Sequence, residues 1–183
     1  MLGIRTILGL AAAVLMLPAE SRADACGPRL VVTFVEDASD IFVLQNASDP
    51  GWVVQRVEID LRETGGGLIF DVTDAGAGVS GWQPYAPAGG TAVAVGRTAV
   101  TDGDRLLNMA FGRFDPGERF EFTIDLDDTL PGGTQTWIDG GEIAGGRVHA
   151  VFGGPDGTTA ERSATFERDT RADTGRHENC LMS

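Results

Sequence analysis

Closely spaced carboxylates are the groups of this sequence best suited to chemistry. Asp125, Asp127 and Asp128 end a strongly alternating segment, and Glu142 follows soon after a Pro-Gly-Gly turn. Calcium takes about six to eight oxygen ligands, which aspartates beside a turn can supply from carboxylates and carbonyls. The pattern therefore predicts a calcium site at these four residues, with solvated surface charge as the competing interpretation.

Two further acidic groups fall at the ends of expected strands, Asp71 with Asp74 and Asp102 with Asp104. Neither has the Asp-x-Asp-x-Asp-Gly spacing of an EF-hand loop. For both groups we favour the interpretation as solubilising surface charge. Asp102 and Asp104 are the next candidates if the first group binds no calcium.

A third acidic string offers a catalytic alternative. Glu58-Ile59-Asp60-Leu61-Arg62-Glu63 is similar to the Glu-x-Asp-x-x-Glu motif of the laminarinase-like glycoside hydrolases. The resemblance implies Glu58 as nucleophile, Glu63 as acid/base and Asp60 as the residue that tunes the nucleophile. A retaining mechanism needs its two carboxyls about 5 Å apart. The surroundings are not Trp-rich, so we favour a strand whose outer face carries Glu58 and Asp60.

Other catalytic classes find little support in the sequence. Only two histidines are present, His149 and His177, and no Gly-x-Ser-x-Gly elbow accompanies them. The chain has no lysine, which excludes a Gly-x-x-x-x-Gly-Lys phosphate loop. We therefore expect a binding protein rather than an enzyme.

The net charge of −13 bears on the partners of the protein. Such an acidic chain repels the phosphate backbone of nucleic acids, which makes them unlikely ligands. Divalent cations are attracted by the same field. An extracellular glycan or protein on a surface or matrix is the expected macromolecular partner.

The first 25 residues have the pattern of a secretory signal peptide. Arg5 precedes an apolar run at 7–17, and Ala23-Asp24-Ala25 supplies the small-x-small cleavage pattern. A membrane-spanning helix needs about 20 apolar residues, more than this run contains. We expect cleavage before Cys26 and a secreted, periplasmic or cell-surface product without a transmembrane segment. Lipoprotein processing at Cys26 is the alternative.

The two cysteines, Cys26 and Cys180, lie at opposite ends of residues 26–183. In an exported protein such a pair is expected to form a disulfide. No Cys-x-x-Cys motif is present, so the predicted bridge is structural.

Short β-rich runs separated by Gly, Pro, Asp and Asn fill the segment after the signal peptide. Together they predict an all-β fold: one antiparallel β-sandwich domain at 26–183, with a jelly roll as one form. We expect a long loop at 74–90, which contains Trp82 and Tyr85, and a polar tail at 168–183. The ten candidate strands are 30–35, 41–45, 52–61, 68–72, 91–95, 106–111, 119–126, 135–138, 147–152 and 163–167.

Several segments resemble the bacterial exported proteins known as aggregation factor core proteins. The similar segments are 67–71, 76–79, 83–84, 101–104, 122–129 and 142–148. That family name derives from the sponge aggregation factor, a calcium-dependent cell-adhesion complex. The resemblance implies a secreted or cell-surface adhesion or matrix module with calcium as its cofactor. A carbohydrate-active protein, either a glycan-binding module or a small hydrolase, is the alternative.

Overall fold

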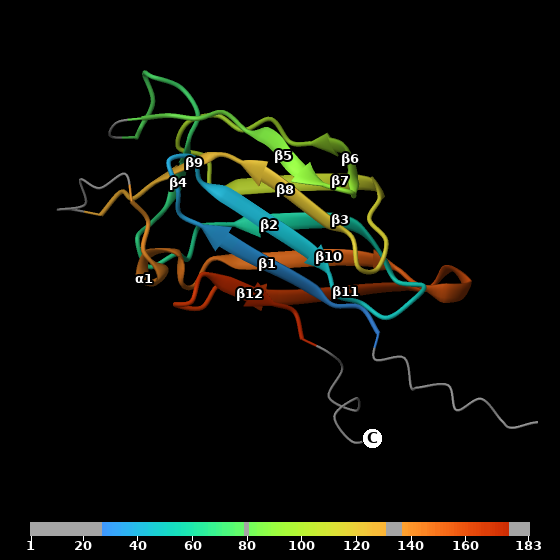
Figure 1. Ribbon diagram of the computed structural model, residues 1–183. Helices are drawn as coiled ribbons and strands as arrows, with labels where there is room; N and C mark the ends of the chain where they lie inside the picture. Colours follow the sequence, from blue (N-terminus) through green and yellow to red (C-terminus); the bar gives the residue numbers. More distant parts are fainter. Residues whose placement is uncertain (1–26, 79–80, 131–136, 176–183) are drawn as a thin grey trace, which may run out of the picture.

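The computed structural model describes residues 27–78, 81–130 and 137–175, which form a β-sandwich (Figure 1). The front sheet contains, in spatial order, β12 (Arg171–Asp173), β1 (Leu30–Val35), β2 (Ile41–Asn46), β8 (Arg119–Thr123) and β5 (Ala86–Gly90). The back sheet contains β11 (Thr159–Thr165), β10 (Arg147–Gly153), β3 (Val53–Asp60), β7 (Leu106–Arg113) and β6 (Val93–Arg97). A two-stranded end sheet pairs β4 (Ile69–Asp71) with β9 (Asp125–Asp127).

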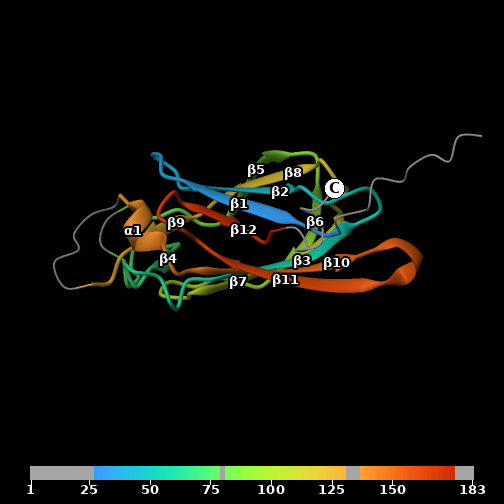
Figure 2. The same cartoon turned by 90° about the horizontal axis from the view of Figure 1, so that it is seen from below.

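The two large sheets lie face to face (Figure 2), and the strand pairings among the described residues are antiparallel. The all-β sandwich predicted from the sequence is therefore confirmed. The finer description as a jelly roll stays a prediction. Within the described residues, no helix combines the length and the apolar character needed to cross a bilayer.

Alternating side chains build the core between the sheets. On β8, Phe120 and Phe122 are buried while Glu121 between them is half-buried. Phe122 stacks on Phe42 of β2, with the ring centroids 5.1 Å apart. The buried apolar side chains form one continuous cluster that reaches from the front sheet to the back sheet. Such an interior fixes the strand register, because a shift of one residue would turn each apolar face outward.

The segment predicted as one strand at 119–126 is divided between two sheets. β8 pairs with β2 as far as Thr123, and β9 pairs with β4 from Asp125 onward. Between them, Ile124 is buried and its N–H donates to the carbonyl of Asp40. The alternation continues through this change, so Asp125 and Asp127 remain on the side opposite the core residue Leu126.

Three sequence-based assignments need correction. The predicted loop at 74–90 ends in a strand, because Ala86–Gly90 is β5 and pairs with β8. The predicted strand at 135–138 lies partly outside the described residues, and Trp137 and Ile138 belong to no strand. Arg171–Asp173, assigned to the polar tail, is β12 and pairs with β1.

Strand β12 forms because one of its side chains is apolar and the others find ionic partners. Ala172 is fully buried, opposite Val32. Asp173 accepts hydrogen bonds from Arg29 Nε at 2.8 Å and Nη2 at 2.5 Å. The hydroxyl of Thr174 accepts a further hydrogen bond from Leu30 N–H at 2.9 Å. These contacts hold residues 171–174 against the first strand of the sandwich.

The predicted signal peptide at 1–25, both cysteines of the predicted Cys26–Cys180 disulfide, and His177 lie outside the described residues. These assignments therefore stay predictions.

Candidate metal centre

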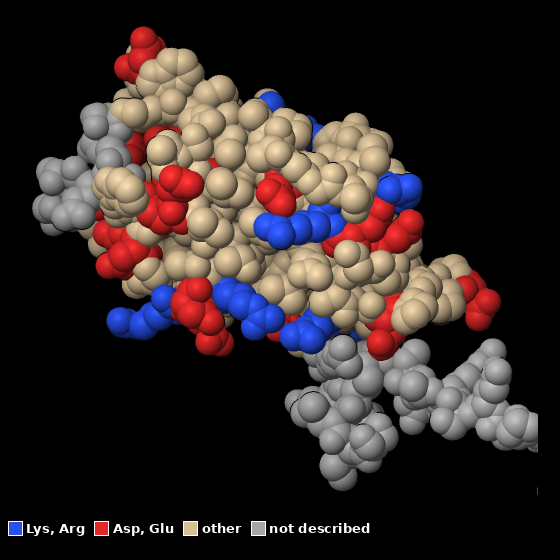
Figure 3. Space-filling model, in the orientation of Figure 1, with Lys and Arg blue, Asp and Glu red and all other residues tan. Residues whose placement is uncertain are grey.

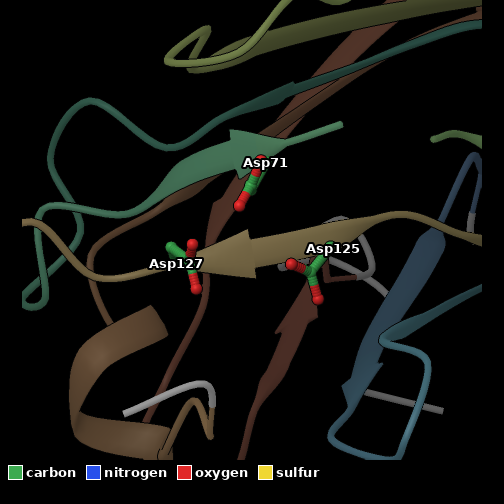
Figure 4. A group of neighbouring side chains, drawn as sticks. All are labelled: Asp71, Asp125 and Asp127. Carbon is green, nitrogen blue, oxygen red and sulfur yellow. The ribbon is translucent and has the colours of Figure 1, made fainter. Parts of the chain in front are cut away.

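The end sheet brings three carboxylates onto one face. Asp71 of β4 lies opposite Asp125 of β9, and Asp127 follows two positions later on the same face. One oxygen from each carboxylate lies within 4.8 Å of the other two. In Figure 4, Asp71 points from β4 toward β9, which carries the other two side chains. Carboxylates this close repel one another unless a proton or a cation lies between them.

All three side chains are largely withdrawn from solvent. Asp71 is 3 % exposed and Asp127 is fully buried, while Asp125 is half-buried. The Oδ1 atom of Asp71 and the Oδ2 atom of Asp125 are inaccessible to solvent and have no hydrogen-bond partner. Buried polar oxygens are normally hydrogen-bonded or bound to a metal. These two oxygens are therefore open ligand positions.

Gln83 joins the two strands of the metal centre from the side. Its N–H donates to the carbonyl of Asp71 at 3.2 Å, and its carbonyl accepts from the N–H of Asp125 at 3.1 Å. The side-chain oxygen of Gln83 is also inaccessible to solvent and has no hydrogen-bond partner. An amide oxygen is a good calcium ligand, so Gln83 adds a neutral donor of the right type to this part of the molecule.

Gly78 covers the carboxylates. A Cβ atom built on Gly78 would overlap the Oδ2 atoms of both Asp71 and Asp127. The backbone of the loop that follows β4 therefore passes directly over these two side chains, closer than any residue with a side chain could. Such an approach gives backbone groups access to the metal centre.

Burial and mutual repulsion raise the pKa values of two members of the group. Desolvation, with the nearby Asp127 as the next cause, raises the pKa of Asp71 to about 6. Desolvation also raises the pKa of Asp125 to about 7, with repulsion from Asp127 and Asp71 added. The folded protein thus favours protons on these carboxylates when no cation is present. A divalent cation would displace those protons and keep the carboxylates ionised.

The electrostatic surroundings of the metal centre are acidic. Acidic side chains gather at the end of the molecule that carries β4 and β9 (Figure 3). Asp40 is 2 % exposed and accepts a hydrogen bond from Leu126 N–H at 3.0 Å. Burial and then repulsion from Glu36 raise the pKa of Asp40 to about 9. Asp40 is therefore protonated at neutral pH and adds no charge, although it lies beside β9.

Asp102 anchors the first part of the loop that covers the site. Its Oδ1 atom accepts hydrogen bonds from the N–H groups of Val72 at 2.6 Å and Thr73 at 2.9 Å, and Oδ2 accepts from the Thr73 hydroxyl. The hydroxyl bond is the main cause that lowers the pKa of Asp102. Asp104 likewise accepts hydrogen bonds from the N–H and hydroxyl of Thr101. Both carboxylates therefore have structural tasks in the loops that they brace.

The residues predicted from the sequence as calcium ligands are only partly brought together. Asp125 and Asp127 belong to the carboxylate group, whereas Asp128 and Glu142 do not. Glu142 lies in α1 (Gly140–Ile143), where its Oε2 accepts from the N–H of Asp139 at 2.8 Å. Asp139 in turn accepts from the N–H groups of Gly141 and Glu142, which makes a capping box. Asp128 is 7 % exposed and follows β9 directly.

Asp71 is the member of the group that the sequence-based prediction did not include. It was assigned to surface charge together with Asp74, yet it is buried whereas Asp74 is exposed. The one feature of the sequence that could have identified Asp71 is its position at a strand end, because both Asp71 and Asp125 border short β-rich runs. The pairing of β4 with β9 joins segments more than fifty residues apart, and no local pattern encodes it.

The residues of the hydrolase-like string, Glu58, Asp60 and Glu63, differ in their positions and partners. Glu58 and Asp60 lie on β3, but Glu63 lies beyond the end of that strand and is exposed. Both carboxylate oxygens of Asp60 accept from Arg62, at 2.8 Å from Nε and 2.6 Å from Nη2. That pairing, with the hydrogen bond to Arg62 as the main cause, lowers the pKa of Asp60. Asp60 and Arg62 thus close the end of β3 with an ion pair, and the catalytic alternative stays a prediction.

The aromatic side chains of the predicted long loop differ in their surroundings. Tyr85 packs against Phe122 of the core, with ring centroids 5.0 Å apart, and the Arg97 guanidinium lies 4.5 Å from its ring centroid. Trp82 is 50 % exposed. Trp52 is partly buried against the core, and Trp137 is exposed. Of the two loop aromatics, Trp82 is therefore the one whose side chain is exposed to solvent.

No protein-family model, curated protein or solved structure matches this chain. The resemblance to aggregation factor core proteins stays a prediction from the sequence.

Proposed function

We propose that this protein is an exported, calcium-dependent adhesion module, in which one calcium ion bound by Asp71, Asp125 and Asp127 organises the end of the β-sandwich. The observation that carries the proposal is the buried carboxylate group with two open oxygens, on Asp71 and Asp125. A calcium ion supplies the positive charge that this group lacks.

The donor set favours calcium over the transition metals. It consists of carboxylate oxygens, with the amide oxygen of Gln83 and the backbone near Gly78 as further candidates. Hard oxygen donors of this kind suit calcium and magnesium, whereas zinc and copper prefer nitrogen and sulfur. Calcium tolerates an irregular set of about six to eight oxygens, while magnesium demands a tight octahedron and keeps several waters.

Adhesion is supported by where the cation would bind. The loop that begins after Asp71 leaves the sandwich at this end and is exposed at Asp74 and Trp82. Loops held on a rigid scaffold are the usual location of binding residues. A cation that fixes the base of such a loop would make partner binding depend on calcium. The predicted signal peptide and the acidic composition are consistent with an extracellular role, where calcium is abundant.

Thermal unfolding with and without calcium tests this proposal. A ligand at about 100 times its dissociation constant stabilises the folded state by about 2.7 kcal/mol. For a domain of this size we expect a rise in Tm of about 5–10 °C on replacing chelator by millimolar calcium. Asp127→Asn should lose most of that rise, and Glu63→Gln, the same charge change at an exposed position, should keep it.

Two outcomes would contradict the proposal. Equal melting temperatures of the wild-type protein in chelator and in calcium would show that calcium has no stabilising site. A full calcium response in Asp127→Asn would place the site elsewhere. Magnesium at the same concentration serves as the ion control and should give a smaller rise.

A further inference from the structure

A cavity of about 240 Å³ lies beside the metal centre. The described side chains that line it belong to Asp71, Thr73, Asp74 and Trp82. Three described glycines of the same loop also line the cavity: Gly76, Gly78 and Gly81. The cavity therefore combines an aromatic ring, carboxylate and hydroxyl oxygens, and bare backbone.

The chemistry of this lining selects its occupant. Trp82 offers a flat apolar surface, and the carboxylate of Asp74 and the oxygen of Thr73 offer hydrogen-bond acceptors. None of the described residues that line the cavity is basic, so an anionic ligand would find no partner there. A pyranose ring has the complementary features: an apolar face of C–H groups and several hydroxyl donors. Ligand sites commonly join one apolar wall with a few polar groups in this way.

The cavities on the outer face of the back sheet have a different character. One of them has a volume of about 340 Å³ and is lined by Arg56, Glu58, Asn108, His149, Val151 and Glu161. Its described lining offers mixed charges and no tryptophan, tyrosine or phenylalanine ring. The cavity at Trp82 is thus the better match for an uncharged sugar.

Backbone hydrogen bonds connect the cavity to the metal centre. Gln83, the residue after Trp82, is bonded to Asp71 on one side and to Asp125 on the other. Gly78 lines the cavity and also lies over the carboxylates of Asp71 and Asp127. A cation that draws the three carboxylates together would therefore fix the positions of Gln83 and Gly78, the two residues that connect the cavity to the metal centre. By linkage, a sugar that binds the ordered loop would tighten cation binding by the same factor.

We propose that this cavity binds a neutral saccharide, with a pyranose ring stacked on Trp82 and its hydroxyls donating to Asp74 and Thr73, and that the cation strengthens this binding. The cation dependence rests on the proposed function, whereas the saccharide site rests on the cavity itself. The proposal gives the adhesion module a ligand class: uncharged glycans of a cell surface or matrix.

Affinity electrophoresis in gels that contain a polysaccharide tests the proposal. The probes are four neutral polymers (dextran, laminarin, mannan and galactan), with heparin as the anionic comparison. We expect at least one neutral polymer to retard the wild-type protein in millimolar calcium, with at least tenfold weaker binding in chelator. Trp82→Ala should abolish retardation, while Trp137→Ala, a matched loss of an exposed indole, should leave it unchanged.

Calcium binding, measured separately by isothermal titration calorimetry, distinguishes the two proposals. Trp82→Ala should bind calcium as the wild type does, because Trp82 is not a ligand of the metal centre. Absence of retardation by all neutral polymers, retention by heparin alone, or wild-type retardation of Trp82→Ala would overturn the saccharide site. Equal retardation in chelator and calcium would overturn the coupling. A protein that binds sugar but shows no calcium heat would refute the proposed metal centre and leave the saccharide site standing.

Discussion

The carboxylates at the β4–β9 end and those on the outer face of the back sheet are the same residue types in opposite circumstances. On the back sheet, Asp60 is paired with Arg62, and Glu161 lies 3.5 Å from His149. At the β4–β9 end, the charged neighbours that shift the pKa values of Asp71 and Asp125 are all carboxylates. Accordingly, the pKa of Asp60 is lowered, while those of Asp71 and Asp125 are raised.

This contrast indicates what each region needs from outside the chain. On the back sheet, Arg62 balances the charge of Asp60, so this carboxylate requires no counter-ion. At the end sheet, Asp71 and Asp125 are withdrawn from solvent, and the charged neighbours that shift their pKa values are carboxylates, which costs free energy unless a proton or cation compensates. An acidic cluster points to a bound cation when its carboxylates are buried and their charge is not balanced by basic neighbours. Solvated carboxylates carry no such information, because they are common in any acidic protein.

Adding a side chain at Gly78, where the backbone passes close to the carboxylates, should have the largest effect on calcium affinity. In Gly78→Ala the new Cβ would overlap carboxylate oxygens of Asp71 and Asp127. One of these groups must move, and we expect calcium affinity to fall by about tenfold or more, by analogy with other supporting residues of metal sites. Isothermal titration calorimetry measures the affinity. Gly96→Ala is the control, because a Cβ at Gly96 meets nothing within 4 Å. Unchanged calcium affinity in Gly78→Ala would show that the loop containing Gly78 does not support the metal centre.

The pH dependence of stability should differ between chelator and calcium. In chelator, the folded state holds protons on Asp71 and Asp125, with pKa values of about 6 and 7, that the unfolded chain releases near pH 4. The unfolded state therefore binds fewer protons between pH 4 and 7, and stability should fall as the pH rises, by about 3 °C in Tm per pH unit and proton.

In saturating calcium the cation takes the place of those protons, so the decline should flatten or reverse. Asp40, with a pKa of about 9, extends the decline in chelator above pH 7, and Asp40→Asn should remove that upper part. Melting curves from pH 5 to pH 9 in both conditions provide the measurement. Parallel curves in chelator and calcium would indicate that calcium does not replace protons at this end.

A pair of neutralising substitutions should have smaller effects of opposite sign. In chelator at pH 8, Asp125→Asn removes one of three repelling charges, and we expect Tm to rise by about 1–3 °C. Asp60→Asn instead removes the negative charge that pairs with Arg62 and should lower Tm by about 1–2 °C, because the Arg62 member of this ion pair is exposed and the pair is therefore weak. Differential scanning fluorimetry resolves shifts of this size. The same sign for both variants would remove the distinction between the two regions.

The sequence was sufficient to predict elements whose side chains alternate strongly. The pattern of Phe120, Phe122, Ile124 and Leu126 gave the buried face of β8 and β9 correctly, because burial follows directly from period-2 alternation. Strand β5 was missed because Ala86–Gly90 is rich in Gly and Pro and exposed on both faces. Strand β12 was missed because it buries a single residue, Ala172.

The candidate site was predictable only where its residues are neighbours in the chain. Asp125 and Asp127 were identified because strand alternation places them together. Asp71 joins them through the pairing of β4 with β9, a non-local contact that no spacing in the sequence announces. Glu142 was predicted as a ligand because it is acidic and near in sequence, but its carboxylate caps the first turn of α1.

A crystal structure of the protein grown in millimolar calcium, with anomalous scattering recorded from the ion, would show whether calcium binds at the β4–β9 end. We expect one anomalous peak between Asp71, Asp125 and Asp127, with ligand oxygens at about 2.3–2.6 Å. The matched experiment with Asp127→Asn should show a weaker peak or none. An empty β4–β9 end in the calcium-grown wild-type crystal, with Asp71 and Asp125 held by protons or water alone, would contradict the account.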